Sequence, residues 1–127
     1  MQNENGLKEV FEEKRPWGGF RQFPAESGVT VKEIWVESMA RLSLQSHKLR
    51  DEYWFVVSPN LIIELISPDG IKIIIEPIIN STIMIPRDWL HRLMNLDKER
   101  GYVIETSVGI FKEEDIERFA DDYGRMK

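Results

Sequence analysis

The sequence predicts an all-β fold, a single small barrel built from short strands. β-branched and aromatic residues gather in short segments, as strands require. Turn-forming residues separate the segments, most clearly Ser58-Pro59-Asn60 and Ser67-Pro68-Asp69-Gly70. Most segments follow one another without the intervening helical patterns of an α/β protein. These three observations favour a sandwich or barrel over alternating β and α units.

The predicted elements follow the chain in order. Residues 1–14 are polar and form an N-terminal arm or short helix, and residues 15–127 form the single domain. One short helix is expected over 111–124, because Ile116, Phe119 and Ala120 have helical spacing and acidic residues crowd the first turn. The strands are predicted at 29–36, 41–45, 53–57, 61–66, 71–75, 83–85, 91–94 and 102–108.

Composition excludes several classes of protein. The chain of 127 residues has no cysteine, which rules out disulfides and thiolate metal sites. The net charge is −5 and no dense Lys/Arg run occurs, so nucleic acid is not an expected partner. The longest apolar run, 71–85, is interrupted by charged residues and proline, which argues against a membrane span. The first residues lack a leader pattern, and a cytoplasmic location is expected.

Four polar residues form a candidate metal site. Gln45 and His47 are two residues apart, so on a strand their side chains share a face. Glu52 follows after a short turn, and His91, the other of only two histidines, lies downstream. Two imidazoles, a carboxylate and an amide suit a divalent Zn, Mn, Fe, Co or Ni ion without choosing among them. The alternative is that the histidines are ordinary barrel residues and the others exposed polar positions.

Basic residues beside these ligands predict a small anionic substrate. Arg41 shares the inward strand face with Gln45, and Arg50 lies in the turn near the mouth of the site. We therefore expect Arg41 and Arg50, with Lys48 as a further candidate, to bind the anionic group. Arg92 follows His91 directly and points to the opposite face. The alternative for each of them is an ordinary solvated charge.

Two motifs resemble those of the cupin superfamily, which implies a jelly-roll β-barrel. The first motif has a glycine, two histidines, a glutamate and a second glycine, and the second has Pro, Gly, His and Asn. The first falls on Met39, Gln45, His47, Glu52 and Pro59, and the second on Pro86, Asp88, His91 and Asn95. Both glycines of the first motif and the glycine of the second are replaced.

A longer set of residues resembles the cupin domain of type II mannose-6-phosphate isomerases. It covers Arg15-Pro16-Trp17-Gly18, Leu42-Ser43-Leu44-Gln45, Glu52, Trp54, Ile85-Pro86, His91-Arg92-Leu93 and Asp122-Tyr123-Gly124-Arg125. The resemblance implies metal-dependent interconversion of mannose 6-phosphate and fructose 6-phosphate in nucleotide-sugar or polysaccharide synthesis. The family usually has His at the positions of Leu49 and Tyr53, and Gln at Ser107.

The chemistry and the assembly leave alternatives open. Moving a proton between C1 and C2 needs a base, and Glu105 or Lys48 is a candidate. A second hypothesis is a non-catalytic metal- or sugar-binding cupin that partners a separate guanylyltransferase. A third is another cupin enzyme, such as an epimerase or dioxygenase. The apolar hairpin over 61–75 predicts a homodimer.

Overall fold

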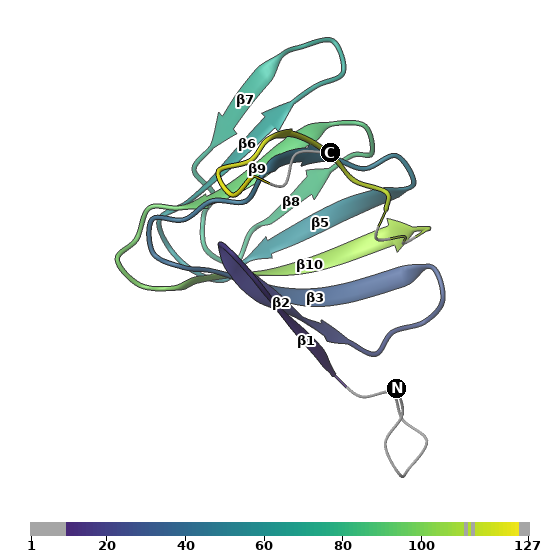
Figure 1. Cartoon of the computed structure of the whole chain (residues 1–127), viewed down its shortest axis with the longest axis horizontal. Coiled ribbons are helices and arrows are strands. Elements are labelled where there is room, and N and C mark those ends of the chain that lie inside the picture. The colour runs from purple at the N-terminus through teal and green to yellow at the C-terminus, as the bar shows by residue number, and fades with distance from the viewer. Residues whose placement is uncertain (1–9, 111, 113, 125–127) are drawn as a thin grey trace.

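The computed structural model describes residues 10–110, 112 and 114–124, which form eleven strands and no helix (Figure 1). The six-stranded antiparallel sheet contains, in spatial order, β1 (Phe11–Arg15), β2 (Gly18–Phe23), β3 (Val29–Val36), β10 (Gly101–Gly109), β5 (Arg50–Val56) and β8 (Thr82–Ile85). The five-stranded sheet contains β11 (Glu117–Ala120), β4 (Leu44–Ser46), β9 (Leu90–Asn95), β6 (Leu61–Ile66) and β7 (Lys72–Ile75). The predicted all-β class is confirmed.

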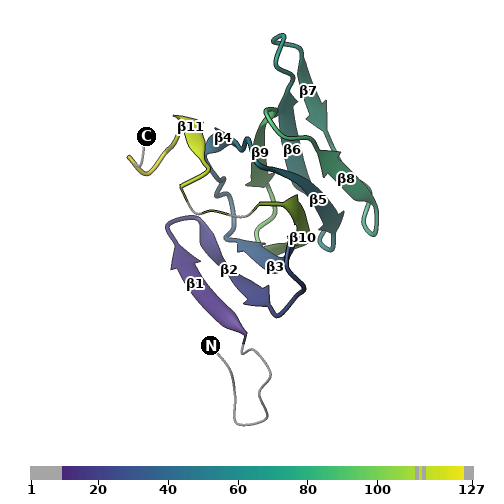
Figure 2. The same ribbon diagram turned by 90° about the vertical axis from the view of Figure 1, so that its right-hand side faces the viewer.

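The two sheets face each other and enclose the core between them (Figure 2). Strand alternation explains why the core forms, because every second residue of β5, β9 and β10 points inward. The fully buried apolar side chains come from both sheets. They include Val36, Trp54, Val56, Ile63, Ile85, Leu93 and Val103.

The N-terminal hairpin shows why the Arg-Pro-Trp-Gly-Gly run is needed. Arg15 pairs with Gly18, so Pro16 and Trp17 form the turn between β1 and β2. A Cβ atom at Gly18 would overlap the Trp35 carbonyl oxygen, so a glycine is required there. The predicted arm is therefore a strand over Phe11–Arg15, while residues 1–9 lie outside the described part.

The predicted C-terminal helix is wrong over the described residues of 111–124. Glu117–Ala120 is the strand β11, which pairs with β4 through a bulge between Arg118 and Ala120. Strand alternation leaves Phe119 47% exposed, although the helical spacing placed it in the core. Pairing with the open edge of β4 outweighs the local helical pattern, as tertiary contacts often do.

Most predicted strands are confirmed with small shifts of their ends. Val29–Val36 and Leu61–Ile66 have the predicted bounds, and the strand predicted over 53–57 begins earlier, at Arg50. The segment 41–45 differs, because only Leu44–Ser46 is a strand and Arg41 makes an isolated bridge to Met94. In the described part of the chain, no helix has the length and apolarity that crossing a membrane requires.

Candidate metal centre and cavity

Three strands of the barrel bring His47, Glu52 and His91 together. His47 directly follows β4, Glu52 lies in β5 and His91 lies in β9. One candidate ligand atom of each residue lies within 4.8 Å of the other two. The Glu52 carboxylate is 3.5 Å from His47 Nε2 and 3.4 Å from His91 Nε2. All three side chains are at most 3% exposed, so this is an interior cluster.

The backbone fixes both imidazoles with the same nitrogen toward the centre. His47 Nδ1 is 2.6 Å from the Asp115 carbonyl oxygen, and His91 Nδ1 is 3.1 Å from the Trp89 carbonyl oxygen. A carbonyl oxygen only accepts, so each Nδ1 carries the proton and donates. Each ring then directs its Nε2 toward the cluster, which is the arrangement of a metal-binding histidine.

The loop around Asp115 holds His47 in place. The Asp115 carboxylate accepts hydrogen bonds from the backbone amides of Lys48 and Leu49 at 2.9 and 3.0 Å. Although burial acts to raise it, these two bonds keep the pKa of Asp115 below its ordinary value. Both the carbonyl and the carboxylate of Asp115 therefore orient the segment that carries His47.

The electrostatics of the cluster suit a bound cation. Burial lowers the pKa of His47 to about 3, and the charges of His91 and Arg50 add to the effect. The ring is therefore neutral near pH 7, which is the form that binds a metal. Glu52 Oε1 and His91 Nε2 are buried and make no hydrogen bond within the described part of the chain. Such groups are costly to bury alone, and a shared metal ion would satisfy both.

Gln45 occupies the fourth predicted ligand position. It is paired with His91 across β4 and β9. Its side chain lines a cavity that His47 and Glu52 also line. Its amide oxygen accepts a hydrogen bond from Ser43 Oγ at 2.8 Å. Three of the four predicted ligands, Gln45, His47 and Glu52, thus line one cavity, and His91 lies beside Glu52 in the cluster.

Arg50 lies against the cluster and not in a turn at its mouth. It is the first residue of β5 and is 7% exposed. Its Nε donates to Glu52 Oε2 at 3.0 Å, and its Nη2 lies 3.2 Å from His47 Nε2. The neutral His47 ring accepts this bond, so the guanidinium provides the positive charge beside Glu52.

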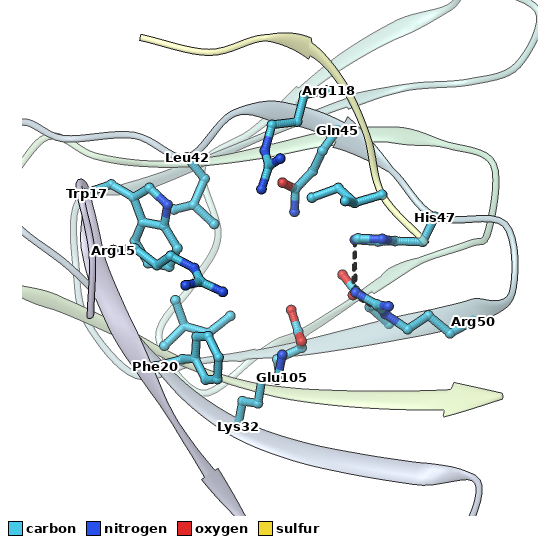
Figure 3. A pocket seen from close by; sticks show the side chains of 13 residues that line it. Arg15, Trp17, Phe20, Lys32, Leu42, Gln45, His47, Arg50, Glu105 and Arg118 are labelled. Carbon is cyan, nitrogen blue, oxygen red and sulfur yellow. Dashed lines mark hydrogen bonds and ion pairs between the residues drawn. The ribbon is translucent and has the colours of Figure 1, made fainter. Parts of the chain in front are cut away.

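A cavity opens beside the cluster between the two sheets (Figure 3). Figure 3 shows Arg15 and Arg118 directed into this space, with Lys32 and Glu105 on another side. The residues that line it combine cations, carboxylates and apolar groups. They are Arg15, Trp17, Phe20, Lys32, Ile34, Leu42, Gln45, His47, Arg50, Glu52, Glu105, Ile116 and Arg118.

Two of the predicted anion-binding residues lie outside the cavity lining. Arg41 is not in the cavity lining, and its guanidinium makes a two-bond ion pair with Asp122 at 2.7 and 2.9 Å. The alternation that placed it inward does not hold, since residues 41–43 are not in a strand. Lys48 is exposed and lies with Asp115 around a separate hollow.

The cavity lining includes three cations that were not predicted from the sequence: Arg15, Lys32 and Arg118. Lys32 shares the inward face of β3 with Ile34 and Val36, so alternation alone could have indicated it. Arg118 was placed in the predicted helix, which concealed its direction. Nothing in the sequence around Arg15 gives its direction, which follows from the β1–β2 hairpin.

Glu105, on β10, is a second buried carboxyl group of the cavity beside Glu52. It accepts a hydrogen bond from Trp54 Nε1 at 3.0 Å, and Ser107 Oγ lies 3.4 Å from its other oxygen. Burial raises the pKa of Glu105, and the negative charge of Glu52 raises it further. A carboxyl group with a raised pKa at the wall of a cavity is suited to proton transfer.

Comparison with known families and curated proteins gives a consistent match. The family described as mannose-6-phosphate isomerase C-terminal matches residues 2–121. The alginate biosynthesis protein AlgA of Pseudomonas putida is 38% identical over 112 residues, covering 87% of this chain and 22% of that protein. The mannose-1-phosphate guanylyltransferase of Escherichia coli K12 is 39% identical over 114 residues, covering 88% and 23%. The chain therefore spans less than a quarter of the length of these relatives.

Solved structures match the fold. The capsular polysaccharide assembling protein CapF of Staphylococcus aureus superimposes with a TM-score of 0.74 at 18% identity, covering 89% of this chain and 32% of that one. A single-site variant of the oxalate decarboxylase of Bacillus subtilis gives 0.75 at 15% identity, with coverage of 87% and 30%. At these identities the likeness concerns the fold alone, and it confirms the predicted cupin barrel.

Proposed function

The chain belongs to the mannose-6-phosphate isomerase C-terminal family, and from this membership we propose that it is a metal-dependent sugar-phosphate isomerase. The reaction is the interconversion of mannose 6-phosphate and fructose 6-phosphate, in nucleotide-sugar or polysaccharide synthesis. The observation that carries the proposal is the buried His47–Glu52–His91 cluster at the wall of a cation-lined cavity. The membership supports the reaction, and the cavity supports a small anionic substrate.

His47, Glu52 and His91, with Gln45 as the fourth ligand, would hold a divalent Zn, Mn, Fe, Co or Ni ion. When bound, this ion supplies Lewis acidity toward the carbonyl group of the sugar. His47 Nε2 has one lone pair, so it cannot serve the ion and Arg50 together. Arg50 would then turn its Nη2 toward the substrate. In that position Arg50 would keep its predicted role in binding the anionic group of the substrate.

Glu105 is the proposed proton-transfer group. An aldose and a ketose differ by the position of one proton between C1 and C2, so the cavity needs a group that accepts and returns it. Glu105 lines the cavity, and Trp54 Nε1 fixes one of its oxygens. The alternative base, Lys48, lies around a different hollow, which favours Glu105.

The phosphate group is proposed to lie among Arg15, Lys32 and Arg118. These three residues come from β1, β3 and β11 and line the cavity together. Lys32 is 7% exposed, and a buried cation binds an anion more strongly than a solvated one. The sequence instead predicted Arg41 and Arg50, with Lys48 as a further candidate, for this role. Arg41 and Lys48 are not among the residues that line this cavity, which suits them less to it.

The two residues that replace histidines of the family pattern, Leu49 and Tyr53, lie outside the cavity lining. Tyr53 is 36% exposed on the outer face of β5, and Leu49 does not line the cavity. Their replacement of histidines therefore leaves the cluster unchanged, which supports a catalytic role. Ser107 is the nearest of the departures, since it contacts Glu105.

A second candidate is a non-catalytic metal- or sugar-binding cupin that partners a separate guanylyltransferase. The observation that favours it is the short match, because the chain covers only 22–25% of relatives that include a guanylyltransferase. Cytoplasmic location and a homodimeric state are further proposals that go with either function.

The decisive experiment follows conversion of mannose 6-phosphate by the metal-loaded protein. We expect turnover, and a loss of roughly 10²–10⁴-fold in kcat for Glu105→Gln with unchanged metal content. Glu33→Gln is the matched control, since β3 alternation places Glu33 outside the barrel. Metal binding without turnover by the wild type would instead select the second candidate.

A matching experiment tests the phosphate site. Lys32→Gln should weaken mannose 6-phosphate binding roughly tenfold or more, because it removes a charge-assisted contact. Arg41→Gln is the control and should leave the affinity unchanged. Calorimetry measures both, and equal affinities of wild type and Lys32→Gln would contradict the site.

A further inference from the structure

The strand β7 is an open edge with an apolar surface. It ends the five-stranded sheet and pairs only with β6 among the described residues. Five isoleucines on and beside it are 40–79% exposed: Ile71, Ile73, Ile74, Ile78 and Ile79. An edge of this kind tends to pair with another strand unless charges or prolines protect it. Pro77 limits the pairing only at its C-terminal end.

The backbone groups of β7 that face outward can be assigned. Ser67 donates to the Ile71 carbonyl oxygen, which directs the backbone of Ile71 toward β6. In an antiparallel ladder the direction alternates along the strand. Ile73 and Ile75 therefore also face β6, whereas Lys72, Ile74 and Glu76 direct their N–H and C=O groups outward. These three positions are available to a further strand.

The sequence of this edge is complementary to itself. Lys72-Ile73-Ile74-Ile75-Glu76 has opposite charges at its two ends and three isoleucines between them. When two copies pair antiparallel around Ile74, Lys72 lies opposite the partner's Glu76, and Glu76 opposite the partner's Lys72. Ile73 lies opposite the partner's Ile75. This register also uses the outward backbone groups of Lys72, Ile74 and Glu76, so charge and hydrogen bonding agree.

We propose that β7 binds the β7 strand of a second copy of this chain, which joins the two five-stranded sheets into one. The interface is isologous, with its two-fold axis at Ile74. Opposed residues in an antiparallel pair share a face, so Ile73 and Ile75 cover each other on the core side. Among the described residues, Lys72 Nζ lies 3.8 Å from the Glu64 carboxylate, and the pairing gives it a second carboxylate. An unrelated partner strand would not explain the reciprocal charges.

Single cysteine variants test the register, because the native chain has no cysteine. In the proposed dimer the two Cα atoms at position 74 are about 5.5 Å apart, within disulfide range. Ile74→Cys should therefore form a covalent dimer on mild oxidation, measured by non-reducing electrophoresis. Lys72→Cys is the control, since its copies are well beyond disulfide range and should stay uncrosslinked. Crosslinking of Lys72→Cys but not Ile74→Cys would overturn the register.

Charge reversals test the interface by sedimentation over a range of concentrations. Lys72→Glu and Glu76→Lys should each weaken dimerisation roughly tenfold or more, and the double variant should restore it. Ile74→Lys should give a monomer, whereas Met84→Lys on β8, an edge strand of the six-stranded sheet, should not. A wild-type monomer at all concentrations, or a dimer lost with Met84→Lys and kept with Ile74→Lys, would overturn the proposal. Cobalt binding at the His47 cluster reports folding of every variant and is expected to remain unchanged.

Discussion

The barrel interior has two halves that are built from the same strands. Along β5 the inward residues run from Glu52 to Trp54 and Val56, and along β9 from His91 to Leu93. On β10 the inward residues change from polar to apolar between Glu105 and Val103, which are both buried. One step of two residues along each strand thus separates the polar half, which carries the cavity, from the apolar half, which carries the core.

The two halves differ in what burial contributes. Each side chain of the apolar half leaves water without losing hydrogen bonds and stabilises the fold. In the polar half, Glu52 Oε1 and His91 Nε2 are buried without a hydrogen bond, which costs about 1–3 kcal/mol for such a group. The apolar half therefore holds the strands in position, and the polar half gains its stability from what it binds.

The largest expected change in stability comes from removing a side chain of the apolar half. Leu93 is fully buried two residues from His91, and Leu93→Ala should lower the free energy of unfolding by about 2–5 kcal/mol. Leu96→Ala, at a 54% exposed position, is the control and should change it by less than about 0.5 kcal/mol. Urea titration followed by tryptophan fluorescence measures both. Equal effects would show that the core does not lie where the structure places it.

The next effect comes from filling the polar half. A divalent ion at about 100 times its Kd should stabilise the protein by about 2.7 kcal/mol. His91→Ala should lose this gain, because it removes a proposed ligand of the ion. Denaturant unfolding with and without the ion provides the measurement. The same gain in both proteins would locate the stabilising ion elsewhere.

The pH dependence of the metal-free protein sharpens the comparison further. His47 has an ordinary pKa of 6.5 when unfolded and about 3 when folded. Between these values the unfolded chain binds a proton that the folded chain does not, so stability falls as pH falls below 6.5. Glu105, with its raised pKa, acts in the opposite sense.

Comparison with His47→Asn separates these contributions, since Glu105 titrates in both proteins. Between about pH 6.5 and 5, the wild type should lose more stability than His47→Asn as the pH falls. Unfolding free energies at several pH values measure the difference. Parallel curves would mean that His47 titrates normally and is not buried as a neutral ring.

The smallest effect is expected at the surface. The ion pair of Arg41 with Asp122 is 44% and 45% exposed, so Arg41→Gln should cost at most about 1 kcal/mol. A loss of metal affinity in this variant would contradict the position of Arg41 outside the cavity. Metal titration and thermal unfolding together check it.

The sequence predicted the strands and the grouping of His47, Glu52 and His91 better than the direction of individual cations. Alternation and turn residues identify Val29–Val36 and Leu61–Ile66 because both depend on local spacing. Arg118 could not be placed, since its strand exists only through pairing with β4. The contact of Arg50 with Glu52 likewise depends on where β5 begins, which spacing does not reveal.

The most direct test of the metal centre is a cobalt titration of the metal-free protein, followed by visible absorption. We predict a spectrum typical of nitrogen and oxygen ligands that saturates at about one ion per chain, as expected for a single site. The spectrum should be lost in His47→Ala and in His91→Ala. No saturable spectrum in the wild type, or an equal one in both variants, would contradict a metal ion held by His47, Glu52 and His91.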